Sequence, residues 1–179
     1  MQTGWEQRTV AMRIRKTEES DLADLLAIWN EVIEEGGSIP FEAPMDLAEF
    51  RGFLMDQQLC MSAIADDGRA VGMFQLHPLV GGRCDAYANA TYIVDQEARG
   101  RGIGRALVMR SLAEAKHLGY QAMVFIGVVD SNHAARHCYE GCGFTERGTL
   151  PQGFRTKDGH HEDMHLYYRS LDDLHMDAQ

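Results

Sequence analysis

The stretch Arg99-Gly100-Arg101-Gly102-Ile103-Gly104-Arg105 carries the most information about this chain of 179 residues. Three glycines within five residues let a backbone approach a ligand closely, because no β-carbons stand in the way. The apolar residues that follow, up to Leu118, recur at helical spacing. The first turn of a helix has unpaired N–H groups and the positive end of the helix dipole, so it attracts phosphate. The segment therefore predicts an anion cradle, most plausibly for a pyrophosphate, to which the three arginines add positive charge.

Two common phosphate motifs do not fit this segment. A P-loop requires GxxxxGK followed by Ser or Thr, and the segment has no such lysine. A dinucleotide fingerprint requires GxGxxG, and from Gly100 and Gly102 the third glycine would fall on Arg105. The spacing is instead Arg-x-x-Gly-x-Gly, with Arg99, Gly102 and Gly104 as its fixed points.

A second motif follows the almost wholly apolar segment 122–129, which predicts a strand buried on both faces. It reads Ser131-Asn132-x-x-Ala135-x-x-x-Tyr139-x-x-x-Gly143-Phe144, and a short helix is expected over 132–140. Together the two motifs resemble the GCN5-related N-acetyltransferase (GNAT) superfamily, and within it the phosphinothricin and small amino acid N-acetyltransferases. The resemblance is strong over about residues 85–150 and weaker from 11 to 84.

The resemblance implies that acetyl-CoA is the co-substrate and that an amine takes its acetyl group. In similar enzymes, main-chain groups of the strand before the glycine segment bind the pantetheine arm. The asparagine of the second motif faces that arm, and the tyrosine sits near the thioester sulfur. The coenzyme-binding residues implied are Tyr92, Ile93, Val94, Arg99, Gly100, Arg101, Gly102, Ile103, Gly104, Arg105, Asn132, Ala135 and Tyr139.

Three residues are implied in the chemistry. The N–H of Val94 would stabilise the charge that develops on the thioester oxygen. Tyr139 would return a proton to the departing thiolate; its ordinary pKa of about 10 against about 8.5 for a thiol makes the transfer feasible without making it downhill. The competing interpretation is a core tyrosine on an amphipathic helix.

Asn89 is the third, because the run from Asn89 to Val94 resembles enzymes in which an asparagine positions or polarises the acceptor. On a regular strand the two side chains would point to opposite faces, and a bulge expected from the family would restore Asn89 to the cleft. The general base is left open; His77 and the carboxylates Glu31, Glu34 and Asp85 are the candidates.

The fold class expected is α/β, with a GNAT-like, mostly antiparallel central sheet, a splayed parallel strand pair and flanking helices. Periodicity predicts strands over 11–16, 60–65, 70–77, 87–94, 122–129 and 162–168, and helices over 22–33, 47–54, 103–118 and 132–140. A further strand is expected to open at Gly143 and Phe144. We expect a single N-acetyltransferase domain over 1–179. It would comprise an acceptor-side half at about 10–84, a coenzyme half at about 85–150 and a C-terminal strand at about 160–169.

Charge limits the partners. The chain has 17 lysine and arginine residues against 27 aspartates and glutamates, a net charge of −10. This balance argues against nucleic acid and against an anionic membrane surface. Residues 1–15 contain no apolar run of signal-peptide length, and no stretch approaches membrane-spanning length, so we expect a cytoplasmic protein.

No metal is expected. Cys138 and Cys142, with His133 and His137, recur at helical spacing, but the chain contains no CxxC pair and the pattern is weak as a zinc signature. The histidines at 160, 161 and 165 are interpreted as a polar turn plus one strand residue.

The acceptor is expected to be a small-molecule amine, an amino acid or a related compound. One alternative is a peptide or protein N-terminus, bound mainly by the loops at 30–45 and 150–161. Another is a non-catalytic module that senses coenzyme A. Similar proteins often dimerise, so a homodimer is a further expectation from the resemblance.

Overall fold

The computed structural model describes residues 12–174. Residues 1–11, which include the first residue of the strand expected over 11–16, lie outside the described residues. Most element bounds match the periodicity, and the last strand begins one residue earlier and ends two residues later than expected. The strands are β1 (Met12–Lys16), β2 (Leu59–Ala65), β3 (Ala70–Pro78), β4 (Tyr87–Val94), β5 (Ala122–Val129), β6 (Thr145–Arg155) and β7 (His161–Ser170). The helices are α1 (Leu22–Glu35), α2 (Leu47–Met55), α3 (Ile103–His117) and α4 (His133–Gly141).

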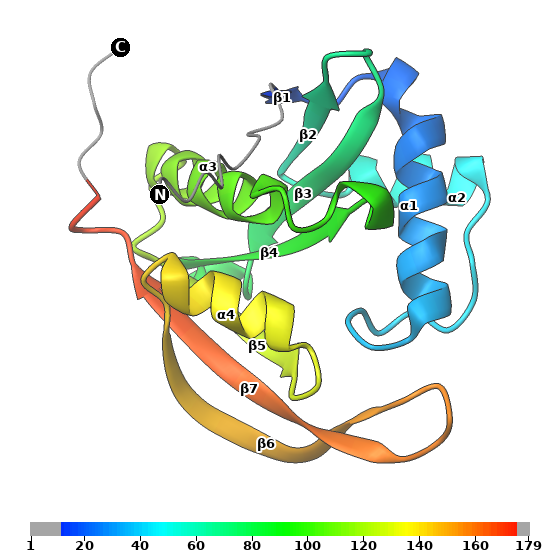
Figure 1. Cartoon of the computed structure of the whole chain (residues 1–179). Coiled ribbons are helices and arrows are strands. Elements are labelled where there is room, and N and C mark those ends of the chain that lie inside the picture. The colour runs from blue at the N-terminus through cyan, green and yellow to red at the C-terminus, as the bar shows by residue number, and fades with distance from the viewer. Residues whose placement is uncertain (1–11, 175–179) are drawn as a thin grey trace, which may run out of the picture.

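The strands form one seven-stranded sheet in the order β1-β2-β3-β4-β5-β7-β6 (Figure 1). Every neighbouring pair is antiparallel except β4 and β5. These two parallel strands pair only where they begin, at Tyr87 with Ala122 and Ala88 with Met123. They then separate, which confirms the expected splayed pair.

Helices cover the two faces of the sheet. On one face Trp29 of α1 and Phe50 of α2 pack with Met73 and Ile93. On the other, α3 buries Leu107 and its apolar neighbours against β3, β4 and β5. Both faces of the central strands are thereby covered, as the apolar segment 122–129 predicted, except that Ile126 and Gly127 of β5 are exposed. Within residues 12–174, no helix has both the length and the apolarity that a membrane crossing requires.

Candidate active site

The gap between β4 and β5 exposes main-chain groups. In the β3–β4 ladder, Tyr87 accepts a bond from Leu79 at 2.8 Å, and the N–H of Asp95 donates to Val71 at 3.0 Å. Since bonding alternates along an antiparallel strand, the odd-numbered residues of β4 bond to β3. The N–H and C=O groups of the even-numbered residues, Tyr92 and Val94 among them, turn towards β5, where pairing has already ended.

Ile93 differs from its neighbours. Its side chain is 2% exposed, and by the same alternation its main-chain groups face β3. A β-carbon on Gly72 would lie 2.8 Å from the Ile93 carbonyl oxygen, so β3 approaches β4 closely at this point. The orientation corrects the expectation that Ile93 offers main-chain groups to a ligand, because those groups are directed at the neighbouring strand.

The glycine segment forms an open turn at the start of α3. Gly100 and Gly102 have φ angles of +75° and +82°, which favour glycine, and a β-carbon on either would meet nothing within 4 Å. Gly102 is the N-cap of α3, and no side chain caps the helix. The first N–H groups of α3 are therefore accessible beside the open end of the β4–β5 gap, as a pyrophosphate cradle requires.

The three arginines of the segment have different surroundings. Arg99 is ion-paired with Glu35, and Arg105 donates a 2.7 Å hydrogen bond to the Gly141 carbonyl. Arg101 is exposed and has no partner within residues 12–174. Only Arg101 is thus free, among the described contacts, to meet an anion without giving up an existing bond.

Tyr139, on α4, is half-buried in a group of aromatic rings. Its ring centroid lies 4.6 Å from that of Phe125 and 6.0 Å from that of Tyr92. Within the described residues its hydroxyl has no hydrogen-bond partner. Burial, with smaller contributions from Cys138 and Cys142, raises the pKa of Tyr139 well above its ordinary value. The phenol therefore stays protonated, the form that an acid needs, but the same shift makes proton transfer to a thiolate less favourable than for an ordinary tyrosine. The ring adjoins the side of β4 that faces the gap.

Tyr92 contributes a main-chain group to the gap, while its side chain has a structural contact. The Tyr92 hydroxyl lies 2.7 Å from Oγ of Ser111 on α3, and burial raises its pKa well above the ordinary value. The side chain thus links β4 to α3 and is already hydrogen-bonded.

The second motif shapes the start of α4. Asn132 is the N-cap, and its Oδ1 accepts a 3.2 Å hydrogen bond from the N–H of Ala135. Ala135 packs against the core beside Tyr139. The capping bond leaves the Asn132 amide nitrogen available as a donor.

Asn89 faces the α1 side of the sheet. The β3–β4 register runs without a shift from Gly72 opposite Val94 to Pro78 opposite Ala88, so the bulge expected in this strand is absent from β4. Asn89 therefore shares a face with buried Ile93 and lies opposite His77 on β3. It projects to the opposite face from Tyr92 and Val94, on the side where α1 and α2 lie.

The β6–β7 hairpin reaches α1 and the loop that follows it (Figure 1). Nζ of Lys157 lies 2.6 Å from Oε2 of Glu34 and 3.0 Å from the Glu34 carbonyl oxygen, and Arg155 pairs with Glu42. The hydrogen bond from Lys157 lowers the pKa of Glu34, which weakens it as a general base. The two segments expected to bind the acceptor are thus in contact, although 30–35 belongs to α1 and 150–155 to β6 and neither part is a loop.

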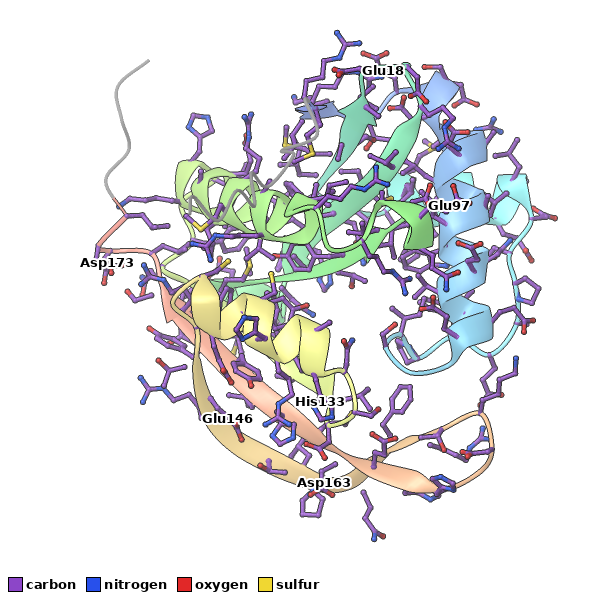
Figure 2. All side chains as sticks on the ribbon, viewed as in Figure 1. Glu18, Glu97, His133, Glu146, Asp163 and Asp173 are labelled. Carbon is purple, nitrogen blue, oxygen red and sulfur yellow. The ribbon has the colours of Figure 1, made fainter. Side chains whose placement is uncertain are left out.

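His165 was missed by the sequence analysis, which treated it as an ordinary strand residue. It is 8% exposed on β7, with Nδ1 2.9 Å from Oε1 of Glu146 and Nε2 2.9 Å from Oδ1 of Asp130. Arg136 of α4 pairs with the same two carboxylates, Asp130 and Glu146. Figure 2 labels Glu146 below α4. The alternation that buries Tyr167 could have placed His165 on the inner face.

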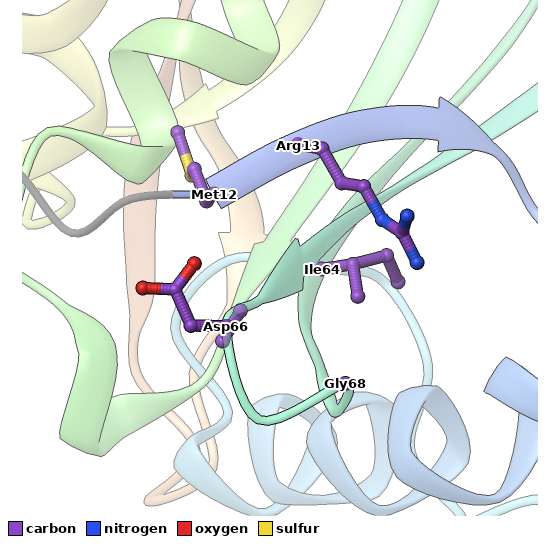
Figure 3. A pocket seen from close by; sticks show the side chains of 6 residues that line it. Met12, Arg13, Ile64, Asp66 and Gly68 are labelled. Carbon is purple, nitrogen blue, oxygen red and sulfur yellow. The ribbon is translucent and has the colours of Figure 1, made fainter.

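Among the described residues, no group of three or more His, Cys, Asp or Glu side chains is arranged to hold a metal ion. A hollow of about 400 Å³ lies at the β1–β2 edge (Figure 3), and β3 separates these strands from β4, so it is not part of the gap. The hollow is lined by Met12, Arg13, Ile64, Ala65, Asp66 and Gly68.

Comparisons with known proteins identify the class. The model of the acetyltransferase (GNAT) family matches residues 24–144. N-acetyltransferase aca1 of Schizosaccharomyces pombe is 27% identical, over 88% of this chain and 85% of its own length. The L-amino acid N-acyltransferase MnaT of Escherichia coli is 32% identical over 45% of each chain, and the relatives include a putative phosphinothricin acetyltransferase.

The solved structures give the same fold. The putative acetyltransferase yncA of Salmonella typhimurium, determined with its cofactor acetyl-CoA, superposes with a TM-score of 0.84 at 22% identity, covering 94% of this chain and 98% of its own. The chain therefore belongs to the acetyltransferase (GNAT) family. It is an acyltransferase with that family's mixed α/β fold.

Proposed function

We propose that this protein transfers the acetyl group of acetyl-CoA to the amine of a small molecule, an amino acid or a related compound, by direct attack in a ternary complex. The observation that carries the proposal is the open β4–β5 gap, with main-chain groups of Tyr92 and Val94 directed into it beside the uncapped start of α3. The glycine segment would hold the pyrophosphate, with Arg101 adding charge, and the gap would hold the pantetheine arm.

Bound acetyl-CoA would supply a thioester that a neutral amine can attack. The N–H of Val94, or that of Tyr92, would donate to the oxygen on which charge develops, a contribution worth about 3 kcal/mol in comparable sites. As the C–N bond forms and the C–S bond breaks, the Tyr139 hydroxyl would give a proton to the departing sulfur. The proton that the amine nitrogen loses would pass through solvent and restore the Tyr139 hydroxyl. Asn89, on the opposite face of β4, would position the acceptor.

Two observations favour a small acceptor. The β6–β7 hairpin contacts α1 through Lys157 with Glu34 and the loop after α1 through Arg155 with Glu42, and these contacts would limit the space for a polypeptide. The relatives include an L-amino acid N-acyltransferase and a putative phosphinothricin acetyltransferase. The cytoplasmic location and the homodimer stay predictions from the sequence.

The test is a thiol-release assay with acetyl-CoA against amino acids, phosphinothricin, polyamines, aminoglycosides and short peptides, beside a calorimetric titration of acetyl-CoA. Turnover with amino acids supports the proposal, and turnover restricted to peptides replaces the acceptor class. Binding without turnover on any amine favours a sensor of coenzyme A. Failure of acetyl-CoA to bind would overturn the proposed function.

A further inference from the structure

The Arg99 guanidinium is already bound on two sides. Nη1 lies 2.8 Å from Oε1 of Glu35, and Nη2 lies 3.1 Å from Oε2, so the two side chains form a bidentate pair. Nε donates a 3.2 Å hydrogen bond to the carbonyl oxygen of Val94. The planar fork of arginine suits this arrangement, because one guanidinium can bind a carboxylate and a carbonyl at the same time.

The bond to Val94 fixes a peptide group at the mouth of the gap. Val94 is the last residue of β4, and its carbonyl turns towards the open side. The N–H of the same peptide group, which belongs to Asp95, donates to Val71 on β3 at 3.0 Å. The peptide is therefore held from both sides, by β3 through its N–H and by Arg99 through its carbonyl.

Glu35 brings a third element to this point. It is the last residue of α1, which Gly36 ends with a φ of +70°. Arg99 follows the short turn Gln96–Ala98 after β4, and its ion pair with Glu35 brings that turn to the end of α1. The Arg99 side chain thus joins the start of the glycine segment to the end of α1 and to the end of β4.

We propose that Arg99 and Glu35 are positioning residues. They hold the Val94–Asp95 peptide in the orientation that the pantetheine arm requires, while Arg101 and the start of α3 meet the phosphate charge. This inference rests on the proposed function. It differs from the sequence prediction, in which Arg99 adds its charge to the anion cradle. The positioning role also differs from a competition, in which Glu35 binds the Arg99 guanidinium until a coenzyme phosphate displaces the Glu35 carboxylate.

Arg99 could position the Val94–Asp95 peptide, add charge to the anion cradle, or be held by Glu35 in competition with phosphate. Substitutions separate these three roles because they change the charge and the geometry of the pair independently. Arg99→Lys keeps the positive charge but loses the planar fork, so it cannot keep the bidentate pair with Glu35 and the Nε bond to Val94 in their present geometry. Glu35→Gln keeps the shape but removes the charge that orients Arg99. The matched control is the Arg110–Glu114 pair on α3, 2.7 Å apart, in which the arginine is 43% exposed against 42% for Arg99.

The experiment is a calorimetric titration of acetyl-CoA into the whole chain and its variants. We expect Arg99→Ala, Arg99→Lys and Glu35→Gln each to raise Kd by about three- to tenfold. The double variant Arg99→Ala/Glu35→Gln should bind acetyl-CoA no more weakly than Arg99→Ala alone, since both substitutions break the same arrangement of Glu35, Arg99 and the Val94 carbonyl. Arg110→Ala and Glu114→Gln should leave Kd unchanged.

A donor without phosphates gives a second readout. S-acetylpantetheine has the arm and the thioester, so its kcat/KM should fall by the same factor as that of acetyl-CoA in Arg99→Ala. Recovery of binding in Arg99→Lys, or a loss confined to acetyl-CoA, would show that Arg99 serves the phosphates. Tighter binding by Glu35→Gln would show competition. Either result overturns the inference alone, whereas a wild-type chain that does not bind acetyl-CoA overturns the proposed function with it.

Discussion

Arg105, in the first turn of α3, donates a 2.7 Å hydrogen bond from Nη1 to the carbonyl oxygen of Gly141, the last residue of α4. The bond joins the helix that begins at the glycine segment to the helix that carries Tyr139. A carbonyl at the end of a helix has no partner within its helix, so Arg105 also satisfies an otherwise open acceptor. The distance from the proposed phosphate cradle to the proposed acid is thereby constrained through side-chain and main-chain bonds.

Gly102→Ala is expected to weaken coenzyme binding at least as much as it weakens the fold. The φ of +82° costs an alanine about 1 kcal/mol, while the space around the new methyl group is open in the ligand-free chain. That same space is where a phosphate would approach the start of α3. We expect Kd for acetyl-CoA to rise about tenfold or more, measured by calorimetry, with a loss of about 1 kcal/mol in the free energy of unfolding.

Gly119→Ala is the matched control for this substitution. Gly119 follows the other end of α3, has a φ of +92°, and a β-carbon there would also meet nothing within 4 Å. It should cost similar stability and leave Kd unchanged. If both alanines raise Kd equally, the effect of Gly102 is general and the segment is not the phosphate site.

Tyr139→Phe is expected to lower kcat about 100-fold while Kd for acetyl-CoA stays the same. The ring contacts with Phe125 and Tyr92 survive the change, so only the hydroxyl is lost. Because burial raises the pKa of Tyr139, its ionisation should not limit activity below about pH 10. Tyr120→Phe, which removes a hydroxyl bonded to Gln58, is the control and should keep full activity. Unchanged turnover in Tyr139→Phe would remove this residue from the mechanism.

Local sequence was enough to predict the parts of the site that depend on one segment. The continuous apolar run over 122–129 predicted a strand covered on both faces, which holds except at Ile126 and Gly127. The glycines predicted a backbone that a ligand can approach, and a β-carbon on Gly100 or Gly102 would meet nothing within 4 Å. Strand alternation placed Asn89 on the face opposite Val94, and the absence of a bulge confirmed that simple geometry.

Contacts between distant segments could not be predicted in this way. Arg99 and Glu35 are 64 positions apart, and nothing in either segment indicates that α1 ends beside the glycine turn. The cluster around His165 likewise combines the turn after β5 with α4, β6 and β7, and its members are ordinary polar residues within their own segments. Such pairs depend on the packing of the whole sheet.

Asn89→Ala is expected to lower kcat/KM for the acceptor about tenfold, the value of a hydrogen bond to a bound polar group, without altering Kd for acetyl-CoA. Coenzyme binding should stay the same because the Asn89 side chain lies on the face of β4 that carries Ile93, opposite to the face that carries Tyr92. Steady-state kinetics with varied acceptor at saturating acetyl-CoA gives the measurement. Undiminished activity would dispose of the role, and an equal loss of coenzyme binding would show that Asn89 supports β4.

His165→Gln is expected to remove a pH dependence of stability. Burial opposes the charged imidazole, but the hydrogen bonds to Glu146 and Asp130 outweigh it and raise the pKa of His165 above its usual 6.5. A raised pKa in the folded state means that the stabilisation is complete below the unfolded value of about 6.5 and is lost as pH rises through the folded pKa. The free energy of unfolding should therefore fall above pH 6.5 in the wild-type chain.

At acidic pH the stability of the cluster changes with pH in the opposite direction. The His165 bonds lower the pKa values of Asp130 and Glu146, so their contribution is present above their usual range near pH 4 and is lost as pH falls through the lowered values. Denaturant unfolding from pH 4.5 to 9 should show a decline above 6.5 that His165→Gln lacks. The control is His160→Gln, since exposed His160 pairs only with Asp158 and its loss should leave the profile intact. If the wild-type and His165→Gln profiles run parallel across this range, the cluster does not hold a charged histidine.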